Sequence, residues 1–121
     1  MDTDTSFLEG DVVWIDLSPV VGREQNGRRP AVVVSAADYN ELVDTMLFVV
    51  PLTTVNRGWP NHVRVFGPTG LSRDSWALTE QMRAVSRERV SAVAGAVDDK
   101  VLAAIREWIA VFLGMGDEPK P

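Results

Sequence analysis

Stretches rich in β-branched and aromatic residues recur along most of the chain and predict a succession of strands. The clearest are GDVVWIDL (10–17), AVVVS (31–35) and TMLFVVPLTT (45–54). The apolar run of 31–35 indicates burial on both faces, whereas Pro51 indicates an edge, a bulge or a strand end. HVRVF (62–66) alternates as a half-exposed strand does. Further short strands are expected at 76–79, within 80–90 and in SAVAGAV (91–97). A two-turn helix is expected over 36–44, and polar loops are expected at 18–29, 55–60 and 67–75.

The period of the pattern changes after Asp98. Apolar residues then recur at helical spacing along one side of an α-helix, namely Val101, Leu102, Ile105, Trp108, Ile109 and Phe112. Asp98 or Asp99 is expected to cap this helix, and Gly114 suits its C-terminus. Short strands before one terminal helix predict a β-rich α+β fold with a strongly curved antiparallel sheet or partial barrel. We expect one domain over 9–114 between flexible tails at 1–8 and 115–121.

The chain has 121 residues, no cysteine and a formal charge of −5. Without cysteine it has no disulfide, thiol nucleophile or thiolate metal ligand. Its apolar runs are far shorter than the roughly 20 residues of a membrane span, and its acidic N-terminus lacks a secretory pattern, so a cytoplasmic protein is expected. Residues 20–90 hold nine arginines against seven acids. These arginines are either a phosphate-binding surface, since arginine grips phosphate bidentately, or scattered solvated charges.

Few kinds of catalytic chemistry are open to this composition. One histidine, His62, excludes a His-based zinc triad, and its place at the start of an alternating strand predicts an exposed imidazole. No phosphate-binding glycine motif or carboxylate cluster with metal-ligand spacing occurs, so no metal and no cofactor is expected. RNA cleavage is compatible with these residues because RNA carries its own nucleophile, the 2′-OH. An arginine can then stabilise the charged phosphate, and a hydroxyl can orient it.

Three ordered blocks of sequence carry a resemblance to a known family. Residues 10–35 contain G-x-E-Q-x-G-x-R-P, 49–65 contain V-P-x-T-T, and 74–90 contain L-x-E-Q-x-R. Together they resemble the MazF/PemK toxins of bacterial toxin–antitoxin systems over about residues 9–113. The resemblance implies an SH3-like curved sheet with short helices, a homodimer and inhibition by a MazE-like antitoxin. It also implies metal-independent, sequence-specific cleavage of single-stranded RNA to 2′,3′-cyclic phosphate and 5′-OH ends, which inhibits translation.

The resemblance assigns the chemistry to Arg29, directly before Pro30, and to Thr53. It also implies RNA contacts from Glu24, Gln25, Glu80 and Gln81. Further candidates for the RNA groove are Thr54, Arg28 and Trp59. Arg28 is either a positioning contact or solvated, and Trp59, in a loop, is the aromatic residue best placed to stack on a base. Trp14 is expected in the core.

Two other functions stay open at this point. One is a non-cutting toxin on the same fold that acts by binding a protein, as the related gyrase poisons do. The other is a silent paralogue that binds an antitoxin but has lost cleavage. The presence of both Arg29 and Thr53 favours the nuclease, because a protein that only binds gyrase has no need of that pair.

Overall fold

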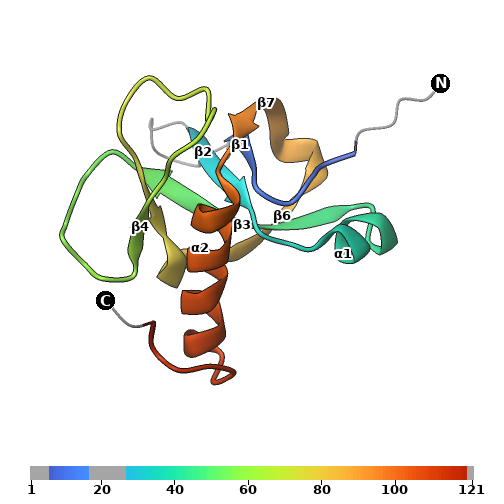
Figure 1. Ribbon diagram of the computed structural model, residues 1–121. Coiled ribbons are helices and arrows are strands. Elements are labelled where there is room, and N and C mark those ends of the chain that lie inside the picture. Colours follow the sequence, from blue (N-terminus) through green and yellow to red (C-terminus); the bar gives the residue numbers. More distant parts are fainter. Residues whose placement is uncertain (1–5, 17–26, 120–121) are drawn as a thin grey trace, which may run out of the picture.

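The computed structural model describes residues 6–16 and 27–119, which form one seven-stranded antiparallel sheet with two α-helices and two short 3-10 helices (Figure 1). The elements in chain order are β1 (Asp11–Asp16), β2 (Arg28–Val33), α1 (Ala37–Leu42), β3 (Met46–Thr53), β4 (His62–Arg64), β5 (Trp76–Leu78), η1 (Thr79–Gln81), β6 (Arg83–Ser86), η2 (Arg87–Arg89), β7 (Val90–Ala96) and α2 (Asp99–Phe112).

The sheet is built around β3. One edge of β3 pairs with β2, and the other edge pairs first with β6, over Met46–Val49, and then with β5, from Leu52. The strand order is β4-β5-β3-β2-β1-β7, with β6 beside the first half of β3. The end strands β4 and β7 do not pair, so the sheet stays unclosed. This confirms the β-rich α+β class with a C-terminal helix.

Each face of the central strands packs into its own core, because successive side chains of a strand point to opposite faces. On one face, α2 lays its apolar stripe across the sheet (Figure 1). The enclosed side chains of this core include Val12, Val32, Val50, Leu52 and Ile105. The opposite face buries Val13, Val33, Leu47, Val49 and Val85. Burial on both faces of the second strand agrees with its uninterrupted apolar run.

Two strands have limits that their composition does not predict. β2 begins at Arg28 instead of residue 31, because Arg28 and Arg29 already pair with β1, and Pro30 lies inside the strand. β3 continues through Pro51, which lies between the stretch that pairs with β6 and the stretch that pairs with β5. In both cases the neighbouring strand sets the limit. Arg28 and Arg29, which were expected in the loop over 18–29, therefore belong to β2.

The ends of α2 follow the sequence signals in part. Gly114 has a φ of 75°, and the N–H groups of Gly114 and Met115 donate to the carbonyls of Val111 and Ala110. This is the glycine-terminated C-cap that the position of Gly114 predicts. Asp98 occupies the N-cap position with extended backbone angles, but its side chain makes no capping hydrogen bond.

Packing begins inside the segment expected as an N-terminal tail. Phe7 is only 6% exposed and belongs to the core on the face opposite α2. Its neighbour Leu8 donates its backbone N–H to the Asp11 carboxylate at 2.9 Å and accepts the Asp11 N–H in return. These contacts attach residues 6–8 to the start of β1.

Candidate nucleic-acid interface

Arg29 and Thr53 lie on neighbouring strands and belong to the same face of the sheet. The register of β2 and β3 places Ala31 opposite Pro51. The β2–β3 pairs end there; Arg29, two residues before Ala31, pairs with Ile15 of β1, and Thr53, two residues after Pro51, pairs with Trp76 of β5. Because side chains alternate along a strand, Arg29 and Thr53 both belong to the face opposite α2. We call this side of the sheet the Arg29 face.

The functional groups of these two residues are available for a ligand. The Arg29 side chain is exposed, and it takes part in none of the ion pairs between the described residues. Thr53 is half-buried, and its Oγ1 accepts the backbone N–H of Val55 at 3.1 Å. That bond fixes the oxygen at the end of β3 and leaves the hydroxyl hydrogen free to be donated. A guanidinium and a hydroxyl donor side by side can hold a phosphate group.

A second group of polar side chains gathers where β4 meets η1. His62 Nε2 lies 3.1 and 3.2 Å from the two carboxylate oxygens of Glu80. Asn61 Nδ2 donates to Glu80 Oε1 at 2.8 Å, and Gln81 Nε2 donates to Glu80 Oε2 at 3.4 Å. The ring of Trp59 stacks on the His62 imidazole with 4.6 Å between centroids and 29° between planes. The carboxylate is therefore an acceptor held in place from three sides.

The prediction for His62 is wrong: its side chain is only 1% exposed. The alternation of HVRVF correctly predicts a strand, but the position that it predicts to be exposed is covered by Trp59 and Glu80. A carboxylate only accepts hydrogen bonds, so Nε2 carries the hydrogen in this contact. The other ring nitrogen, Nδ1, is buried without a partner among the described residues. Sequence periodicity gave no sign of this pair, since the two residues are 18 positions apart.

The pKa of the Glu80 carboxyl is lower than its ordinary value. Partial burial raises the pKa, but the hydrogen bond from its own backbone N–H and the contact with His62 outweigh that effect, with a smaller contribution from Gln81. Glu80 is therefore a charged acceptor at neutral pH. Its side chain keeps about a third of its surface exposed, so a bound group can still reach it.

The remaining predicted contact residues are not all brought to this face. Arg28 alternates with Arg29 and lies on the other face, where its guanidinium is 4.9 Å from the ring centroid of Trp14 and its Nε donates to Ser91 Oγ at 3.3 Å. Trp14 itself is half-buried, which makes it less enclosed than the core position expected for it. Thr54 follows β3 and is exposed. Glu24 and Gln25 lie outside the described residues.

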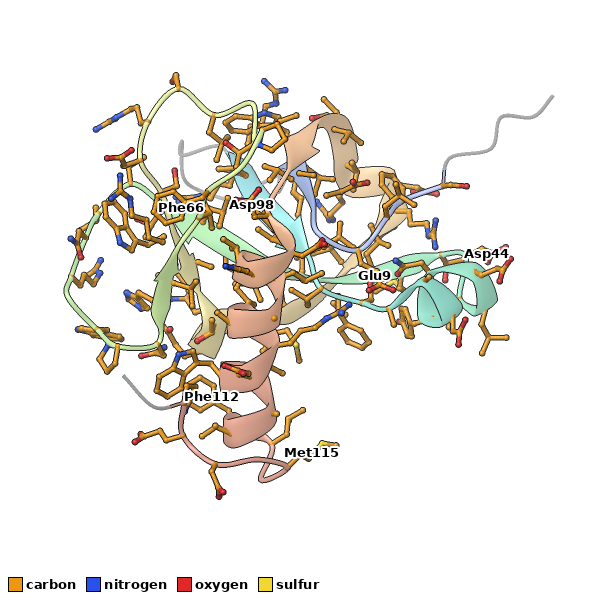
Figure 2. All side chains as sticks on the ribbon, in the orientation of Figure 1. Glu9, Asp44, Phe66, Asp98, Phe112 and Met115 are labelled. Atoms are coloured by element: carbon orange, nitrogen blue, oxygen red, sulfur yellow. The ribbon has the colours of Figure 1, made fainter. Side chains whose placement is uncertain are left out.

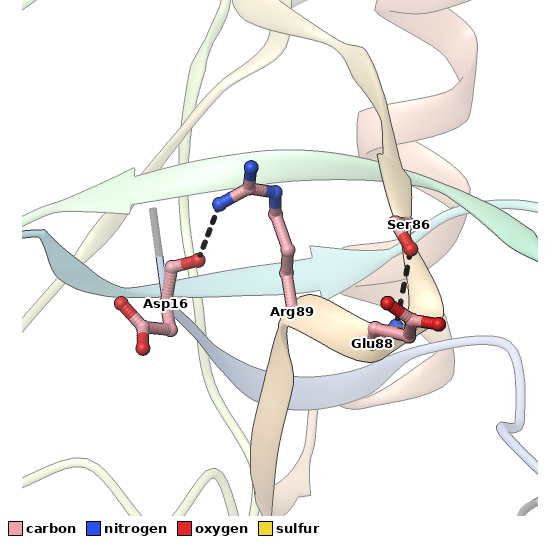
Figure 3. Close-up of a pocket in the computed structure, with 4 residues that line it drawn as sticks. All are labelled: Asp16, Ser86, Glu88 and Arg89. Atoms are coloured by element: carbon pink, nitrogen blue, oxygen red, sulfur yellow. Dashed lines mark hydrogen bonds between the residues drawn. The ribbon is translucent and has the colours of Figure 1, made fainter. Parts of the chain in front are cut away.

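A small open hollow lies elsewhere, between the end of β1 and the β6–η2 turn (Figure 3). Asp16, Ser86, Glu88 and Arg89 line it, and Arg89 Nη1 donates to the Asp16 carbonyl at 3.2 Å. None of the predicted site residues in the described part of the chain lines this hollow. The described residues contain no cluster of three or more His, Asp or Glu side chains placed to hold a metal ion. They also contain no helix that is long and apolar enough to cross a membrane.

Comparisons with known proteins agree with this fold and with the motifs. Residues 8–113 match the family described as PemK-like, MazF-like toxin of type II toxin–antitoxin system. The chain is 38% identical over 106 residues to the endoribonuclease toxin MazF of Escherichia coli K12, which covers 87% of this chain and 92% of that protein. It is 32% identical over 110 residues to the endoribonuclease EndoA of Bacillus subtilis, covering 89% of this chain and 95% of that protein.

Solved structures agree as well. In a crystal structure of MazE–MazF from Deinococcus radiodurans, one chain superposes with a TM-score of 0.79 at 31% identity, covering 93% of this chain and all of that one. An endoribonuclease from a mycobacterial species, at 22% identity and a TM-score of 0.73, shares the fold. The chain belongs to the PemK-like, MazF-like toxins of type II toxin–antitoxin systems.

Proposed function

We propose that this chain, a MazF-type endoribonuclease toxin, cleaves single-stranded RNA without a metal and uses Arg29 and Thr53 as its catalytic residues. The observation that supports this most strongly is that β2 and β3 are neighbouring strands and that Arg29 and Thr53 both belong to the Arg29 face, each two residues beyond the last β2–β3 pair. The residue pair that the family motifs select comes from segments 24 positions apart, and both of its members belong to one face of the sheet.

The reaction follows from the chemistry of RNA. The 2′-oxygen loses its proton and attacks the adjacent phosphorus, while the bond from phosphorus to the 5′-oxygen breaks and the leaving oxygen takes up a proton. The products are a 2′,3′-cyclic phosphate and a 5′-OH. A guanidinium is a cation with several N–H donors, so the role of Arg29 is to neutralise the phosphate oxygens of the transition state. Thr53 donates its hydroxyl hydrogen to one of those oxygens and orients the phosphate.

The bases on either side of the cut are bound by the groups around the catalytic pair. We assign sequence-specific contacts to Glu24, Gln25, Glu80 and Gln81, with Thr54 and Trp59 as further contacts. Arg28 lies on the other face beside Trp14, so no contact is assigned to it. Glu80 accepts hydrogen bonds only, so it selects a base edge that presents N–H donors. Trp59 is 50% exposed and offers an aromatic surface to a base.

Two protein partners belong to the proposal, namely a MazE-like antitoxin and a second copy of the chain, and the site of action is the cytoplasm. The structurally similar MazF of Deinococcus radiodurans has been crystallised with MazE. On this chain, large apolar side chains are exposed at the end of α2 and just after it, namely Phe112, Leu113 and Met115. Figure 2 labels Phe112 and Met115 there. Exposed apolar side chains that lie together are typical of surfaces that contact another protein.

Cleavage of a long unstructured RNA in EDTA tests the proposal. The wild-type protein is compared with Arg29→Ala and with Lys100→Ala, which removes an exposed charge from α2 on the opposite side of the sheet. We expect cuts at a recurring short motif from the wild type and Lys100→Ala, and a loss of at least a hundredfold in rate for Arg29→Ala. Intact RNA with folded wild-type protein would reject the nuclease and leave a toxin that acts by binding a protein.

A further inference from the structure

A second pair of side chains on the Arg29 face lies directly beside Thr53. Trp76 of β5 is the cross-strand partner of Thr53, and Arg64 of β4 is the cross-strand partner of Trp76. Directly opposite residues of antiparallel strands share a face, with Cβ atoms about 4.5–5.5 Å apart. One row of side chains therefore crosses β3, β5 and β4 in the order Thr53, Trp76 and Arg64, and Arg29 of β2 belongs to the same face.

Arg64 is held in place at the end of this row. Its Nη2 lies 2.9 Å from Asp74 Oδ2, and its guanidinium carbon is 4.9 Å from the ring centroid of Phe66 and 5.9 Å from that of Trp76. Figure 2 labels Phe66 on the side of the molecule that carries β4. Because 46% of the Arg64 side chain remains exposed, the guanidinium is oriented by its neighbours and still open to a ligand.

We propose that Trp76 and Arg64 form a nucleotide subsite that continues the RNA path from Thr53 across β5 and β4. Trp76 stacks on the base of a nucleotide next to the scissile phosphate, and Arg64 binds the phosphate on the far side of that nucleotide. The inference rests on the proposed RNA cleavage at Arg29 and Thr53. Trp76 is, with Trp14 and Trp59, one of the tryptophans that sequence alone allows to stack on a base, and the inference gives it a place and adds Arg64 as its partner.

Three properties of the pair fit single-stranded RNA better than a purely structural role. Trp76 is half-buried, so part of the ring surface remains available to a base. The side chains of Arg64 and Asp74 are both exposed, and an exposed ion pair of this kind stabilises a fold by only about 0–1 kcal/mol. An aromatic ring beside a positive charge is the combination that binds single-stranded nucleic acid with little base preference. The subsite therefore contributes affinity, while the sequence of the cut is read elsewhere.

Binding of a 2′-O-methyl oligoribonucleotide, which has no attacking 2′-OH and stays intact, tests the subsite. Dissociation constants are measured from low to moderate salt for the wild type, Arg64→Gln, Trp76→Leu and Trp76→Phe. Arg73→Gln, which removes an exposed arginine in the preceding loop, is the matched control. Thermal unfolding of each variant shows that it is folded.

For Arg64→Gln we expect weaker binding and a slope of log K against log[salt] that is smaller by about 0.7, the loss of one phosphate contact on a single strand. For Trp76→Leu we expect binding about 5- to 100-fold weaker with an unchanged slope, and near-recovery in Trp76→Phe, because base stacking is lost and then partly restored. Arg73→Gln should match the wild type.

The outcomes separate this inference from the proposed function. If the wild type cleaves RNA and Arg64→Gln keeps the wild-type salt slope, the phosphate contact is wrong. If Trp76→Leu binds as the wild type does, the stacking contact is wrong. If the wild type neither cleaves RNA nor binds the probe, the proposed function fails, and this inference fails with it.

Discussion

Replacing His62 should both destabilise the fold and release the carboxylate of Glu80. The imidazole is 1% exposed, contacts both oxygens of Glu80 and lies under the ring of Trp59. His62→Ala removes the hydrogen bond, the ring contact and the filled volume together. His62→Phe keeps a ring of similar size under Trp59 and removes only the hydrogen bond.

The magnitude follows from these contacts. A hydrogen bond to a charged group contributes about 1.5–3 kcal/mol, and the lower end applies because the Glu80 side chain is 31% exposed. An aromatic contact contributes about 0.5–1.5 kcal/mol, again at the lower end because Trp59 is half exposed. With the cost of the emptied volume, His62→Ala should lose about 3 kcal/mol of unfolding free energy. His62→Phe should lose about 1.5 kcal/mol.

Urea unfolding at pH 7 measures both values, and a double-mutant cycle with Glu80→Gln measures the coupling between the partners. Because the pKa of Glu80 is lowered in the folded state, its contribution is present above the ordinary carboxyl pKa. It is lost as the pH falls through the lowered value. The deficit of His62→Phe should therefore shrink in acid. Wild-type stability in His62→Ala, or a coupling free energy near zero, would refute this account of the cluster.

Three further predictions concern the scaffold. Burial raises the pKa of Asp11 despite the hydrogen bond from the Leu8 N–H, so the native state loses stability as the pH rises through that raised pKa. Asp11→Asn keeps an oxygen that can accept the Leu8 N–H. By chemical denaturation, its free energy of unfolding should equal or exceed that of the wild type at pH 7 and should show no advantage at pH 3. Ile105→Ala, at a fully enclosed position beneath α2, should cost about 3–4 kcal/mol in urea unfolding. Gly70→Ala should cost more than about 3 kcal/mol, since a Cβ there would lie 2.1 Å from a carbonyl oxygen of β7. Gly58→Ala, with the same φ of 76° and open space around it, should cost about 1 kcal/mol and is the thermal-unfolding control.

Local patterns predicted the elements that are defined by one segment alone. The helical spacing from Val101 onward gives α2, because an amphipathic stripe needs only one apolar surface to pack on. Gly114 marks the end of that helix, because its positive φ is a local requirement. The apolar run of 31–35 gives the buried part of β2, since a central strand has a core on each side.

Features that depend on a distant partner were missed or misplaced. Arg28 and Arg29 belong to β2 only because β1 extends far enough to pair with them. His62 is buried because Trp59 and Glu80 cover it, and its alternating strand carries no sign of them. The site depends on both kinds of information: the family motifs select Arg29 and Thr53, and the pairing of β2 with β3 places the two residues on neighbouring strands.

The row that joins Trp76 to Thr53 belongs with these distant features. Trp76 and Arg64 lie on short strands 12 positions apart, and the motifs quoted for the blocks 49–65 and 74–90 include neither of them. The pairing of β5 with both β3 and β4 places them there. Tertiary register therefore decides which aromatic and basic side chains of the chain can act together.

The most direct measurement of the central claim compares two oligoribonucleotides in EDTA. They carry the preferred cut site and differ only in the 2′-OH at the nucleotide before the scissile phosphate, which one of them lacks. If the 2′-OH of the RNA is the attacking group, the complete RNA is cut to a 2′,3′-cyclic phosphate and a 5′-OH, and the 2′-deoxy version stays intact at that position. Cleavage of the 2′-deoxy version at the same bond would contradict the account, because the attacking group would then not be the 2′-OH of the RNA.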